Sequence, residues 1–261
     1  MQHSELPGER RESRDVDDLL NGHYQTAVGD LDHFFANEWH FLRRVYAEVG
    51  SSAGSQLLDV CCGVGAQAVA AARYGYRVIG IDYSLTGIQT AASRARAQGV
   101  KSWFVVADCQ AMPFRHPLMF DMVQCLGNAL LLQPSRAAAE LLLATLVRLT
   151  RIHGRIVVGV RPHEINDNWR VEFIDSGRNS ILRRVLPTSD PDCHVLELGE
   201  LSGSPSVRIS FRRRCLALSE GWMNAALIAA GANPLRVYRT ASGFAYHVYK
   251  RAYVVGREKH V

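Results

Sequence analysis

The sequence lacks any apolar run long enough to cross a membrane. Its longest uninterrupted apolar stretches are far shorter than the roughly 18–20 residues that a spanning helix needs. It opens on a polar, charge-mixed segment, Met1 to Glu5, and not on a secretory signal. We therefore expect a cytoplasmic protein with no membrane partner.

Paired cysteine motifs are also missing. The six cysteines, at positions 61, 62, 109, 125, 193 and 215, contain no C-x-x-C pair. Neither a zinc site nor a disulfide framework is predicted from such spacing. We expect no metal site, and small buried thiols in a reducing compartment.

A basic tail is absent as well. The net charge of +5 arises from arginines scattered along the chain, with short clusters such as those at 183–184 and 212–214 and no interleaving of aromatic and basic residues. This pattern favours a solvated basic surface over a nucleic-acid groove. We expect no nucleic-acid partner.

What is present is apolar sequence with a regular rhythm. At 261 residues and 48% hydrophobic content, the chain excludes general disorder and can bury a large core. From residue 56 onward, short β-type runs alternate with helical segments. The expected strands are 56–60, 77–81, 102–107, 120–124 and 155–160, and the expected helices are 65–74, 84–98 and 135–150. This alternation predicts stacked βαβ units and a mostly parallel sheet.

The flanking segments differ from this core. Residues 16–49 have a helical period, residues 163–205 have none, and residues 206–218, 235–239 and 245–255 are β-rich around a helix at 219–230. We predict an α/β fold: a Rossmann-like, mostly parallel seven-stranded sheet with an N-terminal helical lid and an inserted antiparallel β cap. The expected units are the lid (1–54), the ligand-binding core (55–162), the cap (163–217) and the C-terminal part of the core (218–261).

The most informative segment is the glycine loop, Leu57 to Gly65 (LLDVCCGVG). Gly63 and Gly65 permit a tight turn and let a ligand approach the backbone. The following helix presents free N–H groups at its start. Asp82, at the end of the next strand, suits the two hydroxyls of a ribose. This pattern fits a dinucleotide as well as other nucleosides.

Three features favour a nucleoside that carries an amino acid. Asp59 can hold the loop or receive an ammonium group, whereas a pyrophosphate would gain nothing from its charge. Asp108, after the third strand, offers an acceptor to an adenine amino group. The N-terminal helical segment can fold over the pocket. A structural glycine turn remains the alternative, and a dehydrogenase is disfavoured because no hydride-handling residue set is visible.

The glycine loop (57–65), together with segments 80–84 (GIDYS), 107–108 and 120–123, resembles the successive motifs of class I S-adenosylmethionine (SAM)-dependent methyltransferases. Segments 125–128 (CLGN), 160–161 and 214–218 resemble the glycine N-methyltransferase branch of that superfamily. The resemblance implies SAM as cofactor. Its implied cofactor-binding residues are Tyr24, Asp59, Cys61, Gly63, Gly65, Asp82, Tyr83, Asp108, Cys109, Leu126 and Gly127.

Within that set the resemblance implies distinct roles. Cys61 and Gly63 would line the methionine end, and Asp82 would bind the ribose with Tyr83 against the adenine. Asp108 and Cys109 would meet the adenine edge. Leu126 and Gly127 would pass beside the sulfonium, and Tyr24 is the nearest candidate for an aromatic residue of the lid.

On the acceptor side, the resemblance places Asn128 toward the substrate and Arg161 where that branch clamps a carboxylate. A guanidinium can bind a carboxylate bidentately and keeps its charge. Leu132 and Val160 stand where the branch has histidines, and Cys61 stands where it has Ala or Gly. We therefore expect a larger, less polar acceptor than glycine. Asn128 can also serve as a turn residue, and Arg161 can pair with Glu38 or Glu172.

Methyl transfer from a sulfonium is an in-line displacement that needs alignment and exclusion of water. A neutral amine needs no strong base, so we predict N-methylation of a small-molecule amine or amino-acid-like metabolite. An O- or C-acceptor would want a base, for which His163 and Glu164 are the candidates, although both can be plain loop residues. A C- or O-methyltransferase of a specialised metabolite, an RNA methyltransferase and a non-catalytic SAM-binding protein are the alternatives. The sequence leaves open whether the chain forms a homo-oligomer.

Overall fold

The computed structural model describes residues 31–49, 54–112, 114, 119–174, 180–201, 207–240 and 243–253. The first sheet contains β1 (Gln56–Val60), β2 (Arg77–Asp82), β3 (Ser102–Val106), β4 (Phe120–Cys125), β5 (Thr150–Val160), β10 (Ala232–Arg239) and β11 (Ala245–Arg251). The second contains β6 (Asn166–Ile174), β7 (Ser180–Pro187), β8 (Cys193–Leu201) and β9 (Arg208–Leu216). The helices are α2 (Leu31–Val49), α3 (Ala66–Tyr74), α4 (Leu85–Ala97), α5 (Arg136–Leu149) and α6 (Glu220–Ala229).

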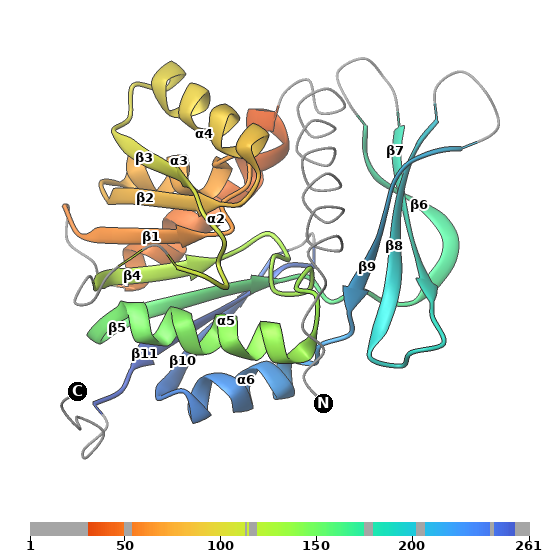
Figure 1. The fold of residues 1–261 in the computed structure, drawn as a ribbon. Coiled ribbons are helices and arrows are strands. Elements are labelled where there is room, and N and C mark those ends of the chain that lie inside the picture. The colour runs from red at the N-terminus through yellow and green to blue at the C-terminus, as the bar shows by residue number, and fades with distance from the viewer. Residues whose placement is uncertain are drawn as a thin grey trace.

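The first sheet has the strand order β10-β11-β5-β4-β1-β2-β3, and the second stands beside it as β6-β7-β8-β9 (Figure 1). Strands β3, β2, β1, β4 and β5 pair in parallel, whereas β11 is antiparallel to both β5 and β10. All pairs of the second sheet are antiparallel. The predicted fold, with a mostly parallel seven-stranded sheet and an antiparallel insertion, is confirmed.

The strand order determines where a ligand can bind. The chain proceeds outward from β1 to β2 and β3, and then returns to the other side of β1 with β4. This reversal makes the β1–β4 gap a topological switch point. In open parallel sheets, ligands bind outside the carboxyl ends of the strands at such a point.

Helices cover both faces of the first sheet because alternate side chains of a strand point to opposite sides. Leu58 of β1 belongs to the core cluster under α5 and α6, and Leu57 belongs to the cluster under α2 and α3. The predicted N-terminal helix is present over 31–49, where buried Leu42, Val45 and Tyr46 pack into the second cluster. The earlier part of that prediction, including Tyr24, lies outside the described residues.

A serine caps each of α4, α5 and α6. Ser84, Ser135 and Ser219 accept a hydrogen bond from the amide three residues on, which satisfies one of the free N–H groups at each helix start. The helix starts predicted near these positions follow from that chemistry.

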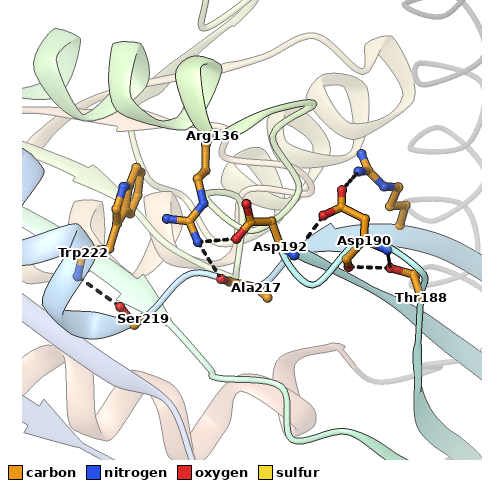
Figure 2. Close-up of polar contacts among 8 residues, drawn as sticks. Arg136, Thr188, Asp190, Asp192, Ala217, Ser219 and Trp222 are labelled. Atoms are coloured by element: carbon orange, nitrogen blue, oxygen red, sulfur yellow. Dashed lines mark hydrogen bonds and ion pairs between the residues drawn. The ribbon is translucent and has the colours of Figure 1, made fainter.

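A polar cluster joins the second sheet to α5 and α6 (Figure 2). The Arg136 guanidinium, at the start of α5, donates to Asp192 (2.8 Å) and to the carbonyl of Ala217 (3.4 Å). It also lies over the Trp222 ring of α6, 5.5 Å from the centroid. Asp190 accepts from the Asp192 amide at 2.9 Å. The Arg136 guanidinium thus links the turn before β8, the residue that follows β9 and the first turn of α6.

The second sheet also holds a buried acid. Glu197 of β8 is fully buried, and its carboxylate forms ion pairs with Arg184 Nε of β7 (2.6 Å) and Arg212 Nε of β9 (2.9 Å). The arginine clusters seen in the sequence therefore include residues that neutralise this acid.

All six cysteines are free, and all but Cys61 are buried, as expected of small core thiols. None of the helices in the described part of the chain is long and apolar enough to span a membrane.

Candidate active site

The glycine loop lies at the carboxyl end of β1, beside the carboxyl end of β2. The amide of Gly63 donates to Asp82 Oδ2 (2.8 Å), and the amide of Ser84 donates to Asp82 Oδ1 (2.9 Å). The Cys62 amide donates to the Ile81 carbonyl at 3.0 Å. Asp82 therefore shapes the loop itself, a role that the sequence did not reveal. Each carboxylate oxygen can accept more than one hydrogen bond, so ribose hydroxyls can still bind there.

Three residues of the loop have left-handed backbone conformations: Cys61 (φ 58°), Gly63 (φ 50°) and Gly65 (φ 74°). Gly65 is doubly required, because a Cβ there would lie 2.5 Å from Cβ of Ala91 on α4. Cys61 adopts its conformation at a cost of about 1–2 kcal/mol, the usual penalty for a residue with a Cβ.

Asp59 is buried behind this loop, on the side of the sheet that α2 covers. It is 1% exposed, and its Oδ2 atom has no hydrogen-bond partner in the described structure. The pKa of Asp59 is raised to about 7, mainly by burial and in part by the nearby charge of Asp82, against an opposing hydrogen bond from Gln124 on β4. Tyr46 of α2 donates to Gln124 Oε1 at 2.9 Å. A buried carboxyl with an unused oxygen fits a ligand that brings a donor group.

At the end of β3, Asp108 accepts from the Gln110 amide (2.8 Å), which fixes a turn at the same edge of the sheet. The Cys109 side chain is buried instead, with its thiol 3.8 Å from Gln133 Oε1. A contact of Cys109 with a ligand would therefore use its main chain. Tyr83 is half-buried directly after Asp82.

The loop after β4 leaves space at the switch point. Gly127 is exposed with φ 66°, and a Cβ built on it would meet nothing within 4 Å. Leu126, in contrast, is buried and packs toward Gly159 of β5. The next residue, Asn128, is also left-handed (φ 68°), a conformation that asparagine tolerates better than most residues.

Asn128 begins a chain of hydrogen bonds at this edge of the sheet. Its Oδ1 accepts from the Arg161 amide (2.5 Å), and its Nδ2 lies 3.2 Å from His163 Nε2. His163 Nδ1 lies 2.6 Å from Nε2 of His194, on β8. A backbone N–H can only donate, so the direction of the chain is determined: Asn128 donates to His163, which donates to His194.

The His163 imidazole is neutral in this setting. Burial, together with the charges of His194, Arg183 and Arg161, lowers the pKa of His163 to about 3. Burial and the charge of Arg183 also lower the pKa of His194. Asn128, His163 and His194 therefore form a neutral, directional hydrogen-bonding wall.

Arg161 makes two contacts beside this wall. Its amide orients Asn128, and its guanidinium lies 5.8 Å from the centroid of the Phe244 ring at the β10–β11 turn. Glu164 is exposed and is not part of the chain of hydrogen bonds. The side chains of Glu38 and Glu172, the alternative partners of Arg161, are outside the described set.

The structure thus brings Asp82, Gly63, Gly127, Asn128, Arg161 and His163 to one edge of the sheet. Sequence reasoning missed His194, Tyr46 and Gln124. No motif marks them, because their positions depend on the register of β8 and β4 and on the packing of α2.

Comparison with known proteins agrees with this geometry. Residues 57–154 match the family of methyltransferase domains. The ubiquinone biosynthesis O-methyltransferase of Klebsiella pneumoniae (strain ATCC 700721 / MGH 78578) is 32% identical over 77 residues, which is 30% of this chain and 32% of the relative. The match thus spans about a third of the length of the curated relatives.

Solved structures share the fold over almost the whole chain. The CcbJ methyltransferase from Streptomyces caelestis has a TM-score of 0.74 at 15% identity, covering 91% of this chain and 98% of its own. SAM-bound CalS10, an amino pentose methyltransferase from Micromonospora echinaspora, has a TM-score of 0.63 at 19% identity, covering 96% and 100%.

Residues 57–154 match a methyltransferase domain, and the solved structures share the fold of the chain. The sequence-based prediction of a methyltransferase domain is confirmed for this part of the chain. Nothing in the comparisons singles out the glycine N-methyltransferase branch.

Proposed function

We propose that the whole chain transfers a methyl group from SAM to a small-molecule acceptor, most specifically to the nitrogen of an amine. The observation that carries this proposal is the neutral Asn128–His163 pair, held at the switch point beside the open space at Gly127. The unused Asp59 oxygen and the Asp82 carboxylate supply matching polar groups on the cofactor side.

The proposed cofactor residues are those that the sequence indicated. Asp82 would receive the ribose hydroxyls, Asp108 the adenine amino group, and Asp59 the ammonium group directly or through water. Bound there, SAM supplies an electrophilic methyl group on a sulfonium. Residues 1–54, with Tyr24, would close the site; 55–162 and 218–261 would form the core; and 163–217 would select the acceptor.

An amine acceptor fits the acid–base properties of the wall. The amine must arrive unprotonated with its lone pair free, and a site lined by arginines and neutral imidazoles disfavours its ammonium form. Asn128 has a second amide hydrogen, beyond the one given to His163, with which to hold a polar group of the acceptor. The Arg161 guanidinium would bind a carboxylate on that acceptor. The acceptor-side motifs resembling the glycine N-methyltransferase branch point the same way.

An O- or C-acceptor is the second candidate. It would rely on His163 or Glu164 as a base, and His163 has the favourable position. A base with a pKa near 3 removes a proton from a hydroxyl poorly at neutral pH, however. This mismatch is our reason for preferring the amine.

The first test is calorimetric titration of SAM and S-adenosylhomocysteine into the wild type and Asp82→Asn. The variant should lose binding at least tenfold, because an amide cannot accept from two backbone N–H groups and two hydroxyls. Asp167→Asn, an exposed acid on β6, is the control. Wild-type protein that folds but binds neither nucleoside would refute the proposal.

The second test separates the acceptor classes. Paired acceptors that differ only in an amine or a hydroxyl would be incubated with the wild type and His163→Gln, and methyl products measured by mass spectrometry. Product from amines that persists in His163→Gln supports the proposal. Product only from hydroxyl compounds, lost in His163→Gln, would establish the O-acceptor. Tight SAM binding with no product from either set would identify a non-catalytic binding protein.

A further inference from the structure

Three potential metal ligands meet where the two sheets join. We propose that His163, His194 and Cys215 form a binding site for a transition-metal ion of the Zn²⁺ class. Their ligand atoms, one imidazole nitrogen from each histidine and the Cys215 thiol sulfur, all lie within 4.8 Å of one another. The proposal shares His163 with the function proposed above but does not need that function to be correct, and it departs from the expectation, drawn from cysteine spacing, that the chain has no metal site.

The fold brings these residues together from three separate segments. His194 and Cys215 are directly opposite in the register of β8 and β9, so their side chains point to the same face of the sheet. His163 follows the end of β5 in the other sheet. The Leu216 amide donates to the Leu131 carbonyl (2.8 Å), which holds the end of β9 against the loop after β4. Spacings of 31 and 21 residues match no metal motif, so the site was invisible in the sequence.

The donor set and its burial suit the ion. Two imidazole nitrogens and one thiolate are a set that Zn²⁺ and Co²⁺ prefer, and three protein ligands leave a fourth position for water or a substrate atom. Both His194 and Cys215 are at least 98% buried. Imidazoles must be neutral to bind a metal, and the lowered pKa of each histidine agrees with that state.

Binding replaces a hydrogen bond that is already short. The nitrogens are 2.6 Å apart, whereas two nitrogens on a tetrahedral zinc ion are about 3.3 Å apart, given bonds of about 2.0–2.1 Å. The rings therefore need to separate by less than about 1 Å. The proton on His163 Nδ1 moves to Nε2, and the thiol releases its proton to solvent, so one proton leaves for each ion bound.

Some of the nearby charged groups oppose the binding of a cation and others favour it. Arg161 and Arg183 lie close enough to His163 to affect its charge and oppose a cation there. Arg213, two residues before Cys215, interacts electrostatically with that side chain, and a thiolate bound to the ion would supply a negative charge that offsets part of the repulsion. A thiolate in the donor set is therefore essential to the site.

Asn128 controls the strength of the site. Its amide donates to His163 Nε2 in the present arrangement, but a metal-bound His163 carries its proton on Nε2 and needs an acceptor. An aspartate at 128 would accept both from that nitrogen and from the Arg161 amide. A carboxylate behind a ligating histidine commonly raises metal affinity about tenfold or more.

The test is titration of the full chain with Co²⁺ after chelator treatment and dialysis, without SAM or acceptor, followed by Zn²⁺ competition. We expect one equivalent of Co²⁺ with a thiolate-to-cobalt charge-transfer band and intense tetrahedral d–d bands. Cys215→Ser should abolish the charge-transfer band, His194→Gln should weaken binding at least tenfold, and Asn128→Asp should strengthen it.

The matched control is Cys193→Ser, which alters a buried thiol next to His194 that points to the opposite face of β8. It should leave stoichiometry and spectrum unchanged. Circular dichroism checks that each variant is folded. Folded wild type without a charge-transfer band, or a band that Cys215→Ser retains, would overturn the proposal. SAM titration of the same samples keeps this failure distinct from a failure of the methyltransferase function.

Discussion

Replacing Asp59 by asparagine should remove a pH dependence of stability that the buried carboxyl imposes. Well below pH 3.8 the carboxyl is protonated in both the folded and the unfolded chain, so it has little effect on stability. As the pH rises, the unfolded chain releases the proton at the ordinary pKa of 3.8, whereas the folded chain keeps it up to a pKa of about 7. The free energy of unfolding therefore falls between pH 4 and pH 7 and then levels off.

The size of this effect follows from the two pKa values. At about 1.36 kcal/mol per pH unit, the gap between 3.8 and about 7 corresponds to roughly 4 kcal/mol. Asparagine has nearly the same shape and cannot ionise. Asp59→Asn should therefore match the wild type near pH 4 and exceed its free energy of unfolding by up to roughly 4 kcal/mol at pH 8.

The assay is urea denaturation at half-unit steps from pH 4 to pH 8, for the wild type, Asp59→Asn and Asp167→Asn. The exposed Asp167 serves as the control and should leave the wild-type profile intact. Parallel profiles for the wild type and Asp59→Asn, or a variant less stable than the wild type at pH 8, would show that the carboxyl is not held protonated by burial.

Two further predictions concern backbone space and buried charge. Gly65→Ala should lower the free energy of unfolding by about 3–5 kcal/mol, because it combines a left-handed residue with a 2.5 Å clash against Ala91. Gly99 is also left-handed but lies in open space, so Gly99→Ala should lower it by only about 1–2 kcal/mol in the same denaturation assay. Glu197→Gln should cost about 2–3 kcal/mol by leaving two arginines without a buried counter-charge, whereas Asp192→Asn, in an exposed pair, should change thermal unfolding by less than about 1 kcal/mol. Equal losses within either pair would contradict the reasoning.

The cofactor side could be predicted from local sequence, because the loops that form it are short and lie between regular strands and helices. Gly63, Gly65 and Asp82 lie in one strand–helix–strand segment, and their spacing predicts that they come together at the carboxyl ends of the two strands. What could not be predicted is that Asp82 hydrogen-bonds the loop amides, since a carboxylate at that spacing serves ligand and loop equally well. The pKa of Asp59 also depends on burial by α2, which no local pattern reports.

The acceptor side was predicted less completely. Asn128, Arg161 and His163 were predicted, and the structure places them together. Arg161 was expected to act through its guanidinium, whereas its contact with Asn128 is made by its backbone amide. His194 was missed because its position depends on the register of an antiparallel strand, and residues 163–205 show no periodicity clear enough to assign that register. For residues 163–205 the sequence predicted an antiparallel insertion but not the pairing of its strands.

The attachment of the second sheet has an evolutionary consequence. The insertion leaves the core after β5 and re-enters before α6, and its two ends are close together, since the ligand atoms of His163 and Cys215 lie within 4.8 Å. A segment with adjacent ends can be lengthened, shortened or exchanged without moving the strands that flank it. The family match, which ends at residue 154, stops just before this insertion. If residues 163–217 select the acceptor, as proposed, this segment can be exchanged without moving the residues proposed to hold the methyl donor.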